Sequence, residues 1–558
     1  MPDAWDHFAA VKMDFFRILA LGQVVLVGVR NNSGTSRFSA DLKRVPALVP
    51  GIAGILAGVV ALGFSISGHG KPLAVLDGLL ASGLFVMLVA EGDRVLAGKM
   101  LTIYAGSAGL AAVYGLAQYS GFDLFEWKRA FAGSAPASTF GNPLFLGDGL
   151  ACALPIAVMG LFSSRRYFRV LFLFLALILA AGLLVSQARG AWAGAFVSLA
   201  VLFVLIGGAT VIRNSWVRVF GVGLAVIVFW GFHPDPLNPG GDPVFRKAEV
   251  LVRQGAGGLR GRFLLWESTA LMMRENPVFG AGRGEFPGRY NLFQGPLLAA
   301  PKYAGLEYHS TGHAHQDYLQ MGAESGVMGL GLFLWLVVSV VAGYRRKIPD
   351  LKAVNYRTVA IGGLAVFLVD GFFNGPFHVP PSAQWVWLVM GISSLVPPGG
   401  GEARNVGRRR LPFLANVLLG LVVVMAARSF ARDLVSEVYL REARLALDKN
   451  QAGIAVERAI NSYALSAEDR RHRFVMGQAY YLAGRYGDAV EQFARDAEEN
   501  PGMASTWHNL GLSLRQSGKF GLAVQSFERA ALLDPTDGVI RELLRESGKA
   551  SQAHKKGN

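Results

Sequence analysis

Long apolar blocks separated by short polar segments fill the chain up to about residue 428. Many blocks approach the twenty residues that an α-helix needs to cross a bilayer, so we predict about twelve membrane-spanning helices. Their ranges are 15–29, 45–66, 72–90, 100–119, 143–162, 170–185, 191–208, 217–232, 319–344, 358–373, 383–396 and 411–427. The first is short and contains Arg17 and Gln23, so its alternative is a helix lying in the membrane interface.

The tail after residue 428 is charged and rich in alanine, and it repeats with a period of 34 residues. Small and aromatic residues mark the period. Gly477, Gly484, Ala489, Phe493 and Pro501 recur as Gly511, Gly518, Ala523, Phe527 and Pro535. This spacing is typical of tetratricopeptide repeats, which are pairs of packed helices. We therefore predict an all-α protein, with a polytopic membrane domain at 1–428 and an α-solenoid of repeats at 429–558. The solenoid would dock a peptide or protein, or brace the membrane domain.

Composition agrees with a membrane protein. The chain of 558 residues is 52% apolar and only 17% charged, whereas soluble domains are about 25% charged. Its one cysteine, Cys152, lies in an apolar block, which excludes an intrachain disulfide and indicates a packing role. No cleavable signal peptide is evident, because Asp3, Asp6 and His7 stand where a basic segment would be.

The net charge of +15 is explained by topology rather than by nucleic acid binding. Lysines and arginines concentrate in alternate loops, which the positive-inside rule places in the cytoplasm. The short loops between those hold only Lys71, Lys128, Arg129 and Arg189. The outer face then receives a long segment at about 233–315 and the repeats. ATP is not available there, and residues 92–99 are one residue too long for a phosphate-binding P-loop.

Three histidines and an aspartate, namely His309, His313, His315 and Asp317, precede the apolar block at 319–344 on this outer face. Imidazole can accept and return a proton near neutral pH, so the stretch is a candidate catalytic segment. The alternative is a polar helix cap with interfacial histidines. A metal site is disfavoured because His-x-His-x-Asp is not a strong ligand spacing, and we expect none.

Arginines on the same face are candidates for binding a phosphate or pyrophosphate, which the guanidinium fork suits. They are Arg189, Arg260, Arg262 and Arg283. For Arg189, snorkelling to lipid headgroups is the alternative. A structural role is favoured for Arg274 and Arg289.

Two further polar residues stand at the outer ends of apolar blocks. Asn142 precedes Pro143, so it either orients a substrate or caps a helix. Asp370 is a carboxylate within an apolar block, and a carboxylate inside a membrane is a candidate for a functional role. The structural alternative is that it pairs with an arginine such as Arg189.

Four motifs in order resemble the O-antigen ligase and O-antigen polymerase superfamily of membrane glycosyltransferases, which corresponds here to about residues 45–396. They are 140–143 (Phe-Gly-Asn-Pro); 186–192 (Ser-Gln-Ala-Arg-Gly-Ala-Trp); Arg262 to Trp266 with Pro277 and 280–282 (Gly-Ala-Gly); and 315–320 (His-Gln-Asp-Tyr-Leu-Gln) with 324–326 (Glu-Ser-Gly) and Gly329. Gln316 departs from the family, which more often has asparagine after the histidine.

The resemblance implies transfer of a glycan from undecaprenyl pyrophosphate to an acceptor hydroxyl at the periplasmic face of a bacterial inner membrane, without a cofactor. His315 would be the general base, with Asp317 a second catalytic candidate. Substrate would be bound by Arg189 and Arg262, and secondarily by Arg283, Arg260, Asn142 and His313.

The acceptor is a lipid A-core, a growing polysaccharide (polymerase) or a protein hydroxyl (O-oligosaccharyltransferase). The repeats mildly favour a protein partner. Two readings from other classes compete with an enzyme. A transporter would require inverted repeats or helices broken at mid-membrane, and the spans show no clear symmetry. A membrane-anchored repeat scaffold would not require the outer arginines and histidine.

Overall fold

The chain folds entirely into helices over the residues that the computed structural model describes. These residues are 94–123, 135–163, 165–232, 257–344, 356–377, 380–394, 413–466 and 470–557. The predicted spans 15–29, 45–66 and 72–90 lie outside them. Each of the other predicted spans falls on a helix, which confirms the all-α fold class.

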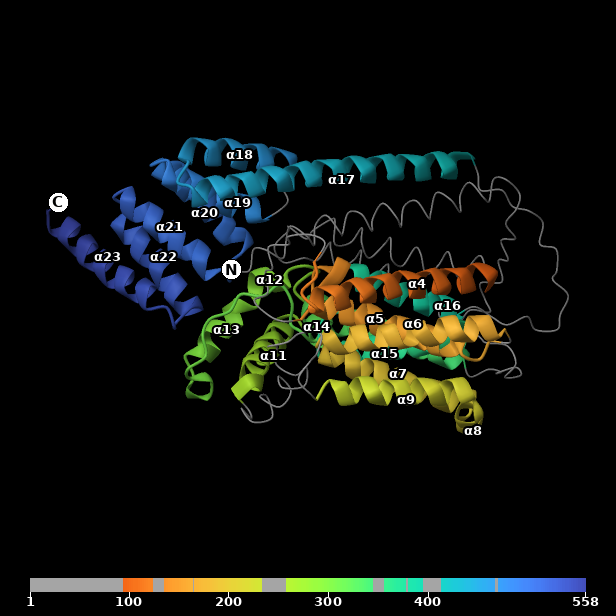
Figure 1. Ribbon diagram of the computed structural model, residues 1–558. Coiled ribbons are helices and arrows are strands. Elements are labelled where there is room, and N and C mark those ends of the chain that lie inside the picture. Colours follow the sequence, from red (N-terminus) through yellow and green to blue (C-terminus); the bar gives the residue numbers. More distant parts are fainter. Residues whose placement is uncertain are drawn as a thin grey trace.

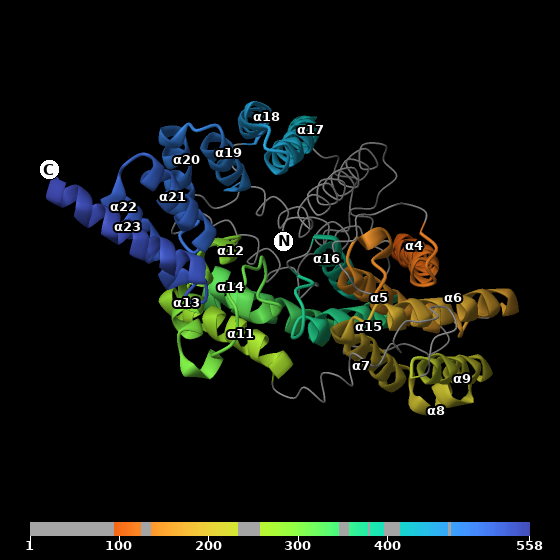
Figure 2. The ribbon, with the colours of Figure 1, turned by 60° about the vertical axis from the view of Figure 1, so that its left-hand side comes forward.

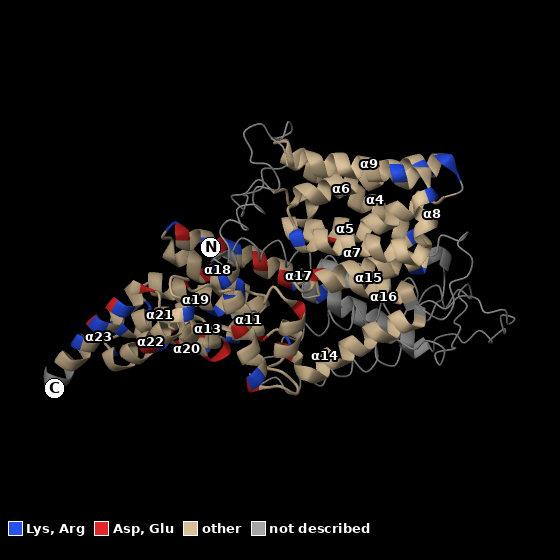
Figure 3. Cartoon of the chain, turned by 90° about the horizontal axis from the view of Figure 1, so that it is seen from below, with Lys and Arg blue, Asp and Glu red and all other residues tan. Residues whose placement is uncertain are grey.

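Most helices of the membrane bundle run nearly parallel or antiparallel to one another (Figure 1). The bundle contains α4 (Arg94–Tyr119), α5 (Pro143–Gly160), α6 (Arg166–Val185), α7 (Arg189–Ile206), α8 (Gly208–Arg213), α9 (Ser215–Trp230), α14 (Asp317–Tyr344), α15 (Tyr356–Asp370) and α16 (Pro380–Ser394). Among the described residues, five helices are long and apolar enough to cross a membrane, namely α4 to α7 and α14. Lysine, arginine, aspartate and glutamate are sparse over the bundle and crowd over the rest of the molecule (Figure 3).

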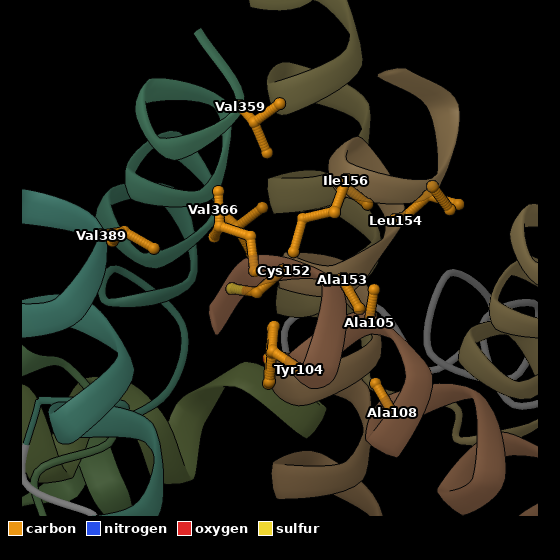
Figure 4. Close-up of a cluster of buried hydrophobic side chains, with 14 of the residues drawn as sticks. Tyr104, Ala105, Ala108, Cys152, Ala153, Leu154, Ile156, Val359, Val366 and Val389 are labelled. Carbon is orange, nitrogen blue, oxygen red and sulfur yellow. The ribbon is translucent and has the colours of Figure 1, made fainter. Parts of the chain in front are cut away.

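Helices α5 and α15 form the centre of the bundle and are buried along nearly their whole length. Small residues let the neighbouring helices approach closely, as is usual where membrane helices pack. A Cβ atom added at Gly194 of α7 would lie 2.8 Å from the carbonyl oxygen of Val366 in α15. Cys152 is buried in this core beside Tyr104 and Val366, as its apolar surroundings predict (Figure 4).

Paired helices make up the repeat domain. They are α17 (Phe413–Asp448), α18 (Ala452–Leu465), α19 (Arg470–Leu482), α20 (Tyr486–Glu499), α21 (Ala504–Gln516), α22 (Phe520–Leu533) and α23 (Gly538–Gly557). The predicted period appears directly in the packing. A Cβ added at Gly477 or at Gly511 would meet the ring of Phe493 or of Phe527, respectively, at the same 2.7 Å. Helix α17 runs without a break through residues 428 and 429, where we placed the domain boundary.

A polar segment between α9 and α14 lies between the bundle and the repeats (Figure 2). It contains α11 (Gly257–Glu275), α12 (Phe286–Arg289), α13 (Asn291–Leu298) and the 3₁₀ turn η3 (Pro301–Tyr303). A second 3₁₀ turn, η2 (Ser138–Phe140), precedes α5.

Helix α14 is broken at Gly326, where φ is 63° and ψ is −171°. The break frees two backbone N–H groups, and the polar segment satisfies both. Val327 N–H donates to the Pro277 carbonyl oxygen at 2.8 Å, and Met328 N–H donates to that of Val278 at 3.2 Å. A Cβ at residue 326 would lie 2.1 Å from the Val278 carbonyl oxygen. Glycine is therefore required both by the backbone conformation and by the space available.

We expect Gly326→Ala to destabilise the protein by at least about 2 kcal/mol, because it combines backbone strain with a clash against backbone. The apparent unfolding temperature of the detergent-solubilised protein measures this. Gly331→Ala in the same helix is the matched control, since a Cβ there meets open space. Equal unfolding temperatures for the two variants would contradict the requirement for glycine at position 326.

Candidate functional site

The predicted site residues His315, Arg262 and Arg189 come together where the N-terminal ends of α7, α11 and α14 lie close to the C-terminal end of α15. His315 lies just before α14, Arg262 in the first half of α11, and Arg189 at the first position of α7. The charges of His315 and Arg262 interact, and so do those of Arg262 and Arg189. Residues far apart in the sequence thus form one cluster.

His315 is half-buried and has a φ of 48°, in the left-handed region that non-glycine residues rarely adopt. Such strain is concentrated at functional sites. Burial, with smaller contributions from the charges of Arg262 and His309, lowers the pKa of His315 from 6.5 to about 4. At neutral pH the imidazole is therefore uncharged and able to accept a proton.

The backbone around His315 is held from both sides. Ala314 N–H donates to the Gln320 side-chain oxygen at 2.9 Å. The Gln316 side-chain oxygen accepts a hydrogen bond from Leu319 N–H, so this residue caps the first turn of α14. The structure thus gives the Gln316 amide a capping contact at the start of α14.

Asp317 is fully buried and ties α14 to the turn that follows α15. Its N–H donates to the Gly371 carbonyl oxygen at 2.8 Å, and its Oδ2 accepts from Phe377 N–H at 2.9 Å. These two bonds give Asp317 an anchoring role, two residues after His315.

Two guanidinium groups lie within reach of one another's charge. Arg262 is half-buried, and its Nη1 donates to the Phe373 carbonyl oxygen at 3.0 Å. Burial and the charge of Arg189 lower the pKa of Arg262, and Asp370 opposes the shift. Arg189 is exposed at the start of α7, whose first turn no side chain caps among the described residues. Two cations beside free helix N–H groups make a region suited to an anion.

Asp370 is fully buried, close to the start of α7. Its Oδ1 accepts from Asn374 Nδ2 at 2.7 Å, and its carboxyl group interacts electrostatically with that of Asp148 in α5. A Cβ at Gly190 would lie 2.1 Å from Asp370 Oδ1, so α7 touches this carboxyl group directly. Sequence reasoning missed Asp148, although an acid within an apolar block is the same signal that singled out Asp370.

Asn142 caps helix α5. It is buried, and its Oδ1 accepts from Leu144 N–H at 2.8 Å. The capping alternative therefore describes the contact that the structure shows. His313 lies near the turn after α15, with its Cβ 3.9 Å from the position of a Cβ at Gly375.

Arg260 and Arg283 are placed apart from the three-residue cluster. Arg260 donates to the carbonyl oxygens of Lys302 and Ala304, at 2.8 and 3.1 Å. It lines a cleft of about 330 Å³ with Phe263, Trp266, Glu267, Lys302 and Tyr303. Arg283 is half-buried in the turn that joins α14, and it forms no ion pair among the described residues. No set of three metal-ligating side chains gathers in the described part of the chain.

The turn that carries Arg283 is fixed to α14 by backbone contacts. Ala281 N–H and Gly282 N–H donate to the carbonyl oxygens of Ala323 and Glu324, at 2.8 and 3.0 Å. A Cβ at Gly280 would lie 2.3 Å from the Glu324 carbonyl carbon. Motifs 280–282 and 324–326 therefore interlock, which gives both of them a structural reason.

The fold defines a helical membrane protein with a C-terminal repeat domain, and Arg189, Arg262 and His315 are grouped at one end of its bundle. Comparison with known families agrees: the model described as O-Antigen ligase matches residues 150–334, and that described as Tetratricopeptide repeat matches residues 504–537. The first range contains Arg189, Arg262 and His315. These matches confirm the predicted resemblance, and they support a membrane enzyme of the O-antigen ligase or polymerase type.

Comparisons with whole proteins add little. No curated protein matches the sequence. The crystal structure of the APC/C hetero-tetramer Cut9-Hcn1 is matched over 91% of this chain and 99% of its own, at 13% identity and a TM-score of 0.20. So low a score carries no argument about this protein.

Asn142 offers a test that separates capping from substrate binding. We expect Asn142→Ala to lower the free energy of unfolding by about 0.5–2 kcal/mol, and Asn142→Ser by much less, because serine is also a good cap. Apparent unfolding temperatures measure both changes. If Asn142→Ser keeps its stability but loses enzyme activity, the amide has a role in substrate binding that capping does not explain.

Proposed function

We propose that the protein is a membrane glycosyltransferase that moves a glycan from an undecaprenyl-pyrophosphate carrier to an acceptor hydroxyl at the outer, periplasmic face. The observation that carries this proposal is the grouping of two interacting arginines, Arg189 and Arg262, with the uncharged imidazole of His315. The match to the O-antigen ligase family over residues 150–334 supports the class of reaction.

The arginines would bind the pyrophosphate of the donor. Two guanidinium groups held near one another repel, and that repulsion is relieved when an anion binds between them. The uncapped first turn of α7 adds N–H donors on the side of Arg189. As the glycosidic bond breaks, negative charge grows on the departing pyrophosphate, and these groups would stabilise it.

His315 would act as general base. Its neutral ring would take the proton of the acceptor hydroxyl while the oxygen attacks the anomeric carbon of the donor sugar. The bond from that carbon to the pyrophosphate oxygen would break, and the lipid pyrophosphate would leave with the bonding electron pair. This displacement draws its energy from the donor and requires neither ATP nor a cofactor.

The other candidates receive supporting roles. Asp317 would fix the segment that carries His315 through its bonds to residues 371 and 377. His313, Arg283 and Arg260 stay proposed substrate-binding residues on the sugar side, where the cleft beside Arg260 has charged and aromatic groups. A polymerase and a protein O-oligosaccharyltransferase would use the same chemistry and differ only in the acceptor.

The direct test is transfer by the purified, detergent-solubilised protein from a lipid-pyrophosphate glycan, with a chelator present, to lipid A-core, polysaccharide and peptide acceptors. We expect His315→Ala to lower the rate by at least about 100-fold, because general bases contribute about 10²–10⁴. Membrane insertion and unfolding temperature should be unchanged. Substantial activity of this variant would exclude the proposed role.

A matched pair of arginines on α11 provides the control for pyrophosphate binding. Arg262→Lys should lose most activity, because an ammonium group cannot reproduce the two-pronged contact. Arg274→Lys, at the exposed end of the same helix, should keep it. If both variants behave alike, the loss reflects the helix rather than the anion site.

The depressed pKa of His315 predicts an unusual pH profile. Only the neutral ring can act as base, and kcat/KM reports the pKa of the free enzyme. With a pKa of about 4, kcat/KM should stay nearly constant from pH 7 to pH 5. An ordinary histidine of pKa 6.5 would lose about 25-fold over that interval. A fall centred near pH 6.5 would show that the ring is not held in the half-buried position near Arg262 described here.

A further inference from the structure

The repeat domain contacts the outer segment through the loops at the ends of its helices (Figure 2). Gly502, between α20 and α21, donates its N–H to the Gly288 carbonyl oxygen at 2.9 Å. Thr536, between α22 and α23, accepts from Tyr308 N–H at 3.4 Å. The Ser310 hydroxyl lies 3.6 Å from the Met503 sulfur. Two successive repeat loops therefore meet the stretch that leads into His315.

Tyr308 is the residue that joins these parts. Its hydroxyl accepts from Asn291 Nδ2 of α13 at 2.8 Å. The same hydroxyl lies 3.4 Å from both the Ala504 N–H and the Gly502 carbonyl oxygen of the repeats. Burial raises the pKa of Tyr308 to about 12, so the group keeps its proton and can both donate and accept.

A second contact brings backbone against backbone. A Cβ at Gly295 of α13 would lie 2.2 Å from the Leu532 carbonyl oxygen and 2.8 Å from that of Leu533, at the end of α22. Only glycine permits this approach, because a carbonyl group of a helix cannot move aside as a flexible side chain can.

The same stretch is fixed on its other side by Tyr290, which is fully buried and stacked on Phe286 with ring centres 4.8 Å apart. The Tyr290 hydroxyl accepts from Thr311 N–H at 2.8 Å and donates to the His309 carbonyl oxygen. Residues 308–311 are thus held between the repeat loops and the core of the outer segment, four residues before His315.

We propose that docking of the repeats sets the position of His315, with Tyr308 as a positioning residue and Gly295 as the site of closest approach. The inference rests on the proposed function for the role of His315. The repeats then complete the enzyme in addition to any partner that they bind. A loop of this kind, with little regular structure, gains order from each side that holds it.

Gly295→Ala is the main test, because alanine is otherwise preferred to glycine within a helix. We expect the clash to separate the repeats from α13 without unfolding either part. Amide hydrogen exchange of residues 303–316 in the full-length protein should become at least about ten-fold faster. The transfer kcat should fall at least ten-fold. Gly521→Ala in α22, where a Cβ meets open space, is the matched control and should match wild type in both measurements.

Tyr308→Phe is the milder variant, which keeps the ring and removes the hydroxyl. It should also speed amide exchange of residues 303–316 and lower kcat, each by a smaller factor than Gly295→Ala does. The substitutions Ser310→Cys and Met503→Cys, added to this variant, would allow a disulfide between the two loops. It should restore both the slow amide exchange and the kcat, because a covalent bond replaces the lost contacts of the Tyr308 hydroxyl. The only native thiol, Cys152, is buried and leaves the pair to react with each other.

Unchanged exchange in Gly295→Ala and in Tyr308→Phe would overturn the inference, as would faster exchange with unchanged kcat. Failure of the proposed function looks different, since wild type would then transfer no glycan. The exchange measurement would still report the docking in that case.

Discussion

The interlock between the broken helix α14 and the segment 277–282 is the constraint on which the site depends. A backbone donor without a partner is costly at a membrane, so the N–H groups freed at Gly326 must find acceptors. They find them on residues 277 and 278. Helix α11, which ends just before these residues, is thereby fixed beside α14. Arg262 and His315 belong to these two helices and their flanks, so their closeness follows from a backbone contact some distance away.

Charge in the site is arranged by the same packing. A free guanidinium pair and a histidine would ordinarily each seek a counter-ion, yet here the nearest carboxyl groups are occupied. Asp317 accepts from Phe377 N–H, and Asp370 accepts from Asn374 and interacts with Asp148. Asp317 thus holds backbone near the cations, whereas the charge of Asp370 partly offsets that of Arg262. In the proposed reaction, the two guanidinium groups would face the anionic leaving group and the neutral imidazole would face the acceptor hydroxyl.

The helices and the repeats could be predicted because their signals are local: apolar blocks near twenty residues, and glycines stacked under Phe493 and Phe527 with a fixed period. The distribution of basic residues predicted that Arg189, Arg262 and His315 share one membrane face, but only the family resemblance predicted that they form one site, since no spacing in the sequence brings them together. The break at Gly326, the closeness of Asp148 and Asp370, and the contact of Arg260 with residues 302 and 304 arise from tertiary packing. Such contacts leave no periodic pattern to find.

Helix α17 carries the chain from the last predicted span into the first repeat as one uninterrupted rod of 36 residues, about 54 Å long. A helix has no hinge between its turns, so the direction that the repeats face is fixed by helical phase. One residue added within the rod would swing them around its axis by about 100°, whereas seven would return them almost to the same azimuth. Insertions or deletions within α17 are therefore tolerated only when their length keeps the repeat loops turned toward the site.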